Sequence, residues 1–133
     1  RIRFGMPDGP CVTTELSRVF SHEIVHACLA RRGDFPSWFH EGLAQRYSGD
    51  RLTAAEKTEI RSAVRDARLP ALSALSDSWS GMSATQARLA YAYALAAIET
   101  LVAEEGEGRI RDLIRSPASI AAAAGRIVES LKR

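Results

Sequence analysis

Apolar residues recur every three or four positions along most of the chain, which is the spacing of one face of an α-helix. Residues that start and stop helices divide this pattern into segments, because threonine or serine precedes several of them and glycine or proline follows. We expect helices over residues 15–32, 37–47, 54–69, 86–106, 108–115 and 119–133. The pattern therefore predicts a mainly α fold.

The ends of these segments carry specific signals. The candidate N-caps are Thr13 or Thr14, Ser37, Thr53 with Glu56 in the capping-box position, and Ser83 or Thr85. Two stretches depart from the helical pattern. Residues 1–4, "RIRF", alternate and predict at most a small N-terminal β remnant, while residues 70–83 predict irregular chain.

The composition is that of a globular domain. Of the 133 residues, 46% are hydrophobic and 26% are charged, so we expect residues 1–133 to form one domain with a core of its own. The net charge is only +2, and the basic residues are scattered, which argues against a nucleic-acid partner. The longest apolar run, residues 89–98, is too short to span a membrane.

The first residue and the cysteines add two minor expectations. The chain begins with Arg1 rather than Met, which favours a domain excised from a longer protein. Cys11 and Cys28 form no CxxC pair, and we expect both to be free thiols.

The stretch "FSHEIVHACLA", residues 20–30, contains two of the three histidines of the chain. On a helix, His22 and His26 lie four residues apart on one face, so that their ring nitrogens can bind one zinc ion. Glu23 points roughly 100° around the helix, beside the metal, where it can take a proton from a zinc-bound water. HExxH on a helix is a metalloprotease signature. The alternative is a helix that carries two surface histidines.

A catalytic zinc site needs a third protein ligand. The chain turns at Gly33 and Pro36 before the stretch "SWFHEGLAQRY", which brings the carboxylate of Glu41 back toward the first helix. His40 is adjacent to Glu41 but 100° away from it on the helix. We therefore expect His40 to be a rim residue rather than a fourth ligand.

HExxH, a turn and then "WFHEGLA" together resemble the gluzincin group of zinc metallopeptidases, specifically the peptidase MA-like families of bacteria. These families pair HELxH with a W-[LF]-x-E-G-x-A motif. The resemblance extends over residues 14 to about 113, and it implies a zincin-like domain that hydrolyses peptides or proteins. It further implies that His22, His26 and Glu41 bind one zinc ion. Glu23 would be the general base.

The resemblance also implies a catalytic tyrosine. In these families an "aYa" helix leads to a glycine about fifteen residues later, and here Tyr91 lies fifteen positions before Gly106. Gluzincins commonly stabilise the oxyanion of the tetrahedral intermediate with a tyrosine, so Tyr91 is the candidate and Tyr93 its rival. The alternative is that both tyrosines pack in the core with their hydroxyls at its edge.

Several neighbours of the motifs have expected structural roles. Trp38 and Phe39 are expected to anchor the second helix in the core. Gln45 is four residues after Glu41 and could orient a ligand histidine through its amide oxygen. Cys28 lies on the far face from His26, where we expect it to be buried in the packing.

The chain also departs from the family. Zincin domains usually place a small sheet before the HExxH helix, whose edge strand pairs with the substrate. Only about a dozen residues precede that helix here, so the substrate groove could be incomplete.

Two functions therefore remain. The first is a zinc-dependent peptidase. The second is a catalytically inactive, zinc-binding helical interaction module. The number of protein ligands distinguishes them, because a structural zinc site is closed by four and a catalytic site keeps a position for water.

Overall fold

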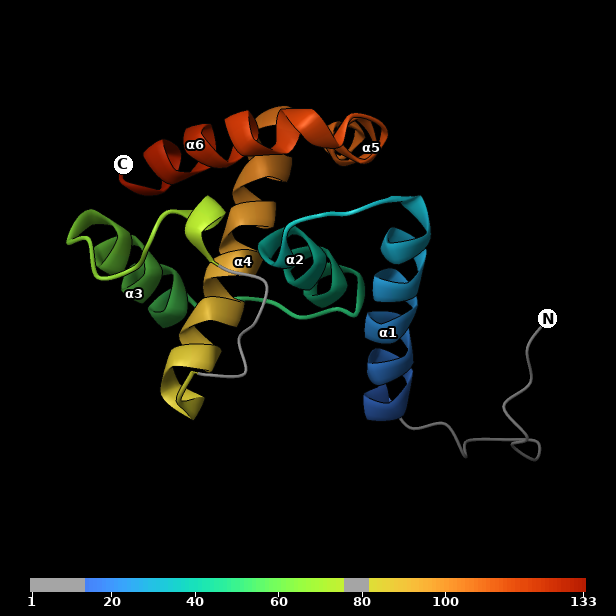
Figure 1. Ribbon diagram of the computed structural model, residues 1–133. Helices are drawn as coiled ribbons and strands as arrows, with labels where there is room; N and C mark the ends of the chain where they lie inside the picture. The colour runs from blue at the N-terminus through green and yellow to red at the C-terminus, as the bar shows by residue number, and fades with distance from the viewer. Residues whose placement is uncertain (1–13, 76–81) are drawn as a thin grey trace.

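The computed structural model describes residues 14–75 and 82–133. Within these ranges the chain is mainly helical, with six α-helices and no strand (Figure 1). The helices are α1 (Thr14–Arg32), α2 (Ser37–Tyr47), α3 (Ala54–Arg65), α4 (Ala84–Glu105), α5 (Gly108–Arg115) and α6 (Ile120–Leu131), with short 3₁₀ turns η1 (Leu72–Ala74) and η2 (Pro117–Ser119). The prediction of a mainly α fold is confirmed. The β remnant expected at residues 1–4 lies outside the described residues.

The long helix α4 is the centre of the fold, and α2, α3, α5 and α6 all pack against it (Figure 1). Its sequence explains this position. Alanine and other apolar residues occur on nearly every side of α4, and a helix that is apolar all round is buried. The helix α1 packs against α2, on the side away from α3. None of the helices in the described ranges combines the length and the apolar character that a bilayer crossing requires.

The core joins α2 to α4. Trp38 and Phe39 of α2 are almost completely buried, as predicted, and pack with Tyr93 and Ile98 of α4. The same two helices also contribute Leu43 and Leu101 to this core. The other helices and η1 contribute Ile60, Leu72, Leu113 and Ile120. Because α2 is fixed in this core, the residues on its outer side are held in place relative to α1.

The predicted starts of the helices are partly confirmed. Thr53 with Glu56 and Ser83 with Gln86 form complete capping boxes at α3 and α4. The prediction that Ser37 caps α2 is wrong. Pro36 is the N-cap, because its carbonyl oxygen already accepts from the first helical N–H groups, and Ser37 lies within the helix.

The end of α3 also differs from the prediction. We expected this helix to continue to residue 69, but it ends at Arg65. Ala67 adopts a left-handed conformation with a φ of 57°, and the N–H of Arg68 then donates to the carbonyl oxygen of Ala63 at 2.8 Å. This turn closes the end of the helix. It brings Leu69 against the core instead of extending the helix into solvent.

Gly42 allows α2 and α4 to approach closely. A Cβ atom at this position would lie 2.5 Å from the carbonyl oxygen of Ala94 and 2.5 Å from Cγ1 of Ile98. A contact that short with backbone can be relieved only by moving one helix. The glycine of the "HEGLA" motif is therefore required by packing.

Gly42→Ala should therefore destabilise the protein. Alanine is the better helix former by about 1 kcal/mol, but overpacking costs about 1–3 kcal/mol, and a clash with backbone belongs at the upper end of that range. We expect a net loss of about 2 kcal/mol, measured as a lower midpoint of urea unfolding. The matched control is Gly125→Ala in α6, where a Cβ would meet nothing within 4 Å and the change should be neutral or stabilising. Equal midpoints for Gly42→Ala and wild type would contradict this explanation.

Candidate metal centre

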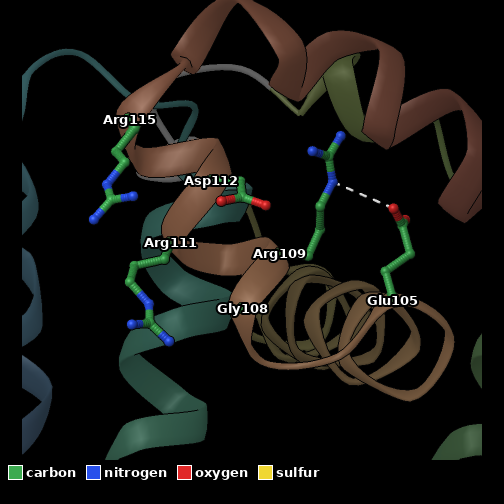
Figure 2. A pocket seen from close by; sticks show the side chains of 6 residues that line it. All are labelled: Glu105, Gly108, Arg109, Arg111, Asp112 and Arg115. Carbon is green, nitrogen blue, oxygen red and sulfur yellow. Dashed lines mark ion pairs between the residues drawn. The ribbon is translucent and has the colours of Figure 1, made fainter.

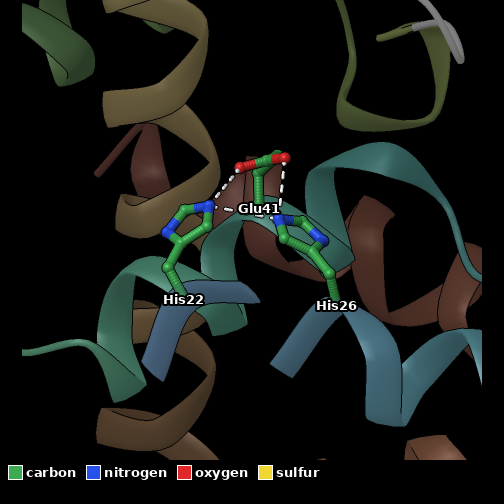
Figure 3. Close-up of side chains that lie close together, drawn as sticks. All are labelled: His22, His26 and Glu41. Carbon is green, nitrogen blue, oxygen red and sulfur yellow. Dashed lines mark hydrogen bonds and ion pairs between the residues drawn. The ribbon is translucent and has the colours of Figure 1, made fainter. Parts of the chain in front are cut away.

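The turn between α1 and α2 assembles the site. Gly33 ends α1 with a φ of 150°, a conformation that favours glycine, and the chain then reverses so that α2 packs along α1. Figure 3 shows the rings of His22 and His26 on α1 pointing toward the carboxylate of Glu41 on α2. All three residues are partly buried. The structure thus brings together the three residues that the sequence motifs suggested as ligands.

The ring nitrogens and carboxylate oxygens of these residues lie close together. Nε2 of His22 lies 3.1 Å from Nε2 of His26, and it lies 3.3 Å from Oε2 of Glu41. Nε2 of His26 lies 3.1 Å from Oε1 of Glu41. Around a tetrahedral zinc ion with bonds of ~2.0–2.1 Å, the ligand atoms are about 3.3 Å apart. The two imidazole nitrogens lie close to that separation, and each contacts a different oxygen of Glu41, so the three side chains converge on a space that suits one zinc ion.

Glu41 also has an unused acceptor. Its Oε2 is buried and accepts no hydrogen bond from the described residues. A buried carboxylate oxygen without a donor costs free energy, and a cation compensates for that cost. The same three residues would also form an ion-pair cluster if a histidine were protonated. The metal content of the protein distinguishes the two states.

His40 is close to the second nitrogen of a candidate ligand. Its Nδ1 lies 3.2 Å from Nδ1 of His26. Burial, and then the neighbouring His26, lower the pKa of His40, which favours a neutral ring whose Nδ1 can accept a hydrogen bond from Nδ1–H of His26. Such a hydrogen bond leaves Nε2 of His26 free to bind a metal. His40 does not join the three donor atoms, as expected, but it is a partner of His26 and not only a rim residue.

Replacing His40 should weaken zinc binding. His40→Leu removes the acceptor for Nδ1 of His26, and losing a partner of this kind typically costs 10–100-fold in metal affinity. His40→Asn retains an acceptor oxygen near the position of Nδ1 and should recover most of the affinity. Competition with a chromogenic chelator measures both. If His40→Leu binds zinc as tightly as wild type, His40 does not orient His26.

Gln45 has a different role from the one expected. Its amide nitrogen donates to the carbonyl oxygen of Glu41 at 3.1 Å and to that of Tyr91 at 2.8 Å. No hydrogen bond within the described residues joins it to His22 or His26. Gln45 instead ties the backbone of α2 at the candidate ligand to the backbone of α4.

Glu23 borders an open pocket beside the metal centre. It is exposed, and it lines a pocket of about 210 Å³ together with His22, Arg18 and Asp50. Arg18 and Asp50 form an ion pair across this pocket, which links α1 to the chain that follows α2. Glu23 is therefore accessible to a small molecule that reaches His22.

The two candidate tyrosines lie in different environments. Tyr93 is completely buried, its hydroxyl donates to the carbonyl oxygen of Pro70 at 2.9 Å, and burial raises its pKa to about 12. Tyr91 is 39% exposed, and burial followed by the charge of Glu41 raises its pKa. Of the two, Tyr91 is the one near the candidate ligands. Its catalytic role remains a prediction.

Cys28 is exposed, so the expectation that it is buried is wrong. It lies on α1, whose main partner is α2, and its exposure shows that it is not buried in that contact. Its thiol is free, as expected. Cys11 lies outside the described residues.

Comparison with protein-family models, curated proteins and solved structures finds no match for the chain. The resemblance to gluzincins therefore remains a prediction that rests on the motifs.

Proposed function

We propose that the chain is a zinc-dependent peptidase of the gluzincin type. His22, His26 and Glu41 would hold one zinc ion. The observation that carries the proposal is the convergence of these three side chains: the two imidazole Nε2 atoms are 3.1 Å apart, and each lies 3.1–3.3 Å from an oxygen of Glu41. Two histidines and a glutamate are a ligand set that catalytic zinc sites use.

The number of donors supports a catalytic rather than a structural site. In the described part of the chain, these three residues form the group whose donor atoms lie within 4.8 Å of one another. A structural zinc site is usually closed by four protein ligands. Three donors beside a pocket favour the enzyme over the inactive zinc-binding module.

The chemistry would be divided among a few side chains. A bound zinc ion supplies an acidified water and polarises the scissile carbonyl. Glu23 accepts the proton as the water attacks and then returns it to the leaving amine. The hydroxyl of Tyr91 donates a hydrogen bond to the oxyanion as negative charge develops. His40 holds the ring of His26.

The test is hydrolysis of an unfolded protein substrate such as reduced casein. We expect the zinc-loaded chain to release peptides, a chelator to stop the release, and added zinc to restore it. His26→Ala is the control, because it removes a ligand and should be inactive at every zinc concentration. If wild type and His26→Ala release peptides at equal rates, the activity does not come from this site.

A further inference from the structure

A second, larger pocket is lined by Tyr91 and shares Arg18 and Asp50 with the pocket beside Glu23. Its volume is about 520 Å³. Arg88 and Tyr91 of α4 line it together with Arg51 from the loop between α2 and α3. Apolar residues, among them Leu52 and Leu95, also line it, as do two carboxylates. The pocket therefore combines apolar surface with arginines, close to the candidate oxyanion donor.

The carboxylates of this pocket are already engaged. Asp50 pairs with Arg18, and Oε1 of Glu56 accepts the N–H of Thr53 at 2.9 Å in the capping box. Neither of them is paired with the remaining arginines of the pocket in the part of the chain that the structure describes.

The guanidinium groups of Arg51 and Arg88 have N–H donors that are available to a ligand. Nη1 of Arg51 donates to the carbonyl oxygen of Asp50 at 2.9 Å, and Arg51 has no ion pair among the described residues. Arg88 reaches Glu59 only at 4.0 Å, and both of these side chains are largely exposed. A pair at that distance in solvent contributes little. Arginine binds carboxylates well, because its planar group can donate two parallel hydrogen bonds.

The distance along α4 relates Arg88 to the position of the scissile bond. Arg88 lies three residues before Tyr91, so the two share one face of the helix and are about 4.5 Å apart along its axis. One residue of an extended peptide spans ~3.3–3.6 Å. A peptide whose scissile carbonyl lies at Tyr91 would therefore bring a group one or two residues away to Arg88.

We propose that this pocket binds a carboxylate of a peptide, and that the enzyme prefers to cleave within two residues of that carboxylate. The carboxylate is either an acidic side chain or the free C-terminus of the substrate. The preference for a cleavage position rests on the proposed peptidase function, whereas binding of an acidic peptide does not.

The test compares peptides that differ only in one charge. One pair is an alanine pentapeptide, blocked at both ends, with glutamate or glutamine at its centre; the other is an acetylated alanine tetrapeptide with a free or an amidated C-terminus. Dissociation constants come from NMR titration of the full chain as Glu23→Gln, which prevents cleavage, with and without zinc. We expect at least one charged peptide to bind about tenfold more tightly than its neutral partner. The pair that shows the difference identifies the source of the carboxylate.

Variants of the two arginines show whether they cause the preference for charged peptides. Arg51→Gln and Arg88→Gln should each reduce the preference, and the double variant should abolish it. Arg115→Gln is the matched control, because this exposed arginine belongs to the separate pocket of α5 shown in Figure 2. The preference should persist in that variant and shrink at high salt. Equal binding of charged and neutral peptides, no detectable binding, or a preference that survives the double variant would overturn the proposal.

The experiments can reject the proposed peptidase function and the proposed carboxylate pocket independently of each other. A chain that prefers acidic peptides but never hydrolyses them would retain the carboxylate pocket and lose the proposed activity. A chain that hydrolyses peptides with no preference for a nearby carboxylate would retain the activity and lose this inference.

Discussion

Glu23→Gln should lower the rate of peptide hydrolysis by about 10²–10⁴ while zinc stays bound. Glutamine has nearly the same shape as glutamate but cannot accept a proton at neutral pH, and the loss of a general acid–base group typically lowers the rate by 10²–10⁴. Glu23 is not one of the three residues whose donor atoms converge, so zinc affinity should change little. The measurements are kcat on a cleaved peptide and zinc content of the same preparation.

Glu129→Gln is the control for that variant, because Glu129 is an exposed residue of α6 that pairs with Lys132. It should behave as wild type in both measurements. A Glu23→Gln variant that cleaves at the wild-type rate would show that Glu23 is not the base. A variant that loses zinc would show that Glu23 supports the metal rather than the proton transfer.

Tyr91→Phe should lower kcat by about 10²–10³ with little change in stability or zinc binding. An oxyanion donor acts only when negative charge develops, and one such donor is worth about 3–4 kcal/mol in the transition state. Phenylalanine keeps the ring and removes only the hydroxyl. Since Tyr91 is partly exposed, the hydroxyl should contribute little to folding.

Tyr93→Phe should show the opposite pattern. It removes the hydrogen bond to the carbonyl oxygen of Pro70, and a buried bond of this kind contributes about 1 kcal/mol. The melting temperature should fall and kcat should stay unchanged. Equal activity in both variants would rule out a catalytic tyrosine, and a loss confined to Tyr93→Phe would show that the wrong tyrosine was chosen.

The sequence predicts the local structure well where local chemistry determines it. The capping boxes at Thr53 and Ser83 mark the starts of α3 and α4, because the signal lies within four residues. The sequence does not predict the end of α3, because alanine, the residue at position 67, is not a residue type that indicates a left-handed conformation. Tertiary packing of Leu69, which the local sequence does not encode, favours that turn.

In the candidate site, too, the sequence predicts what local geometry determines and not what tertiary packing determines. His22 and His26 are related by helix geometry alone, and the motif with its preceding turn pointed to Glu41. The contact of His40 with His26 could not be predicted, because it depends on how α1 and α2 cross. Periodicity could not choose between Tyr91 and Tyr93 either. The helix α4 is apolar on nearly every side, and only the packing around it determines which tyrosine is buried.

The most direct test of the proposed metal centre is the zinc content of the purified full chain, combined with X-ray absorption at the zinc edge. We expect one zinc ion per chain, bound by two imidazole nitrogens, a carboxylate oxygen and a water oxygen, and lost in His22→Ala and His26→Ala. A chain that retains no zinc after incubation with the metal would contradict a zinc site and leave an ion-pair cluster of His22, His26 and Glu41. Four protein ligands and no water would contradict the peptidase and favour a structural module.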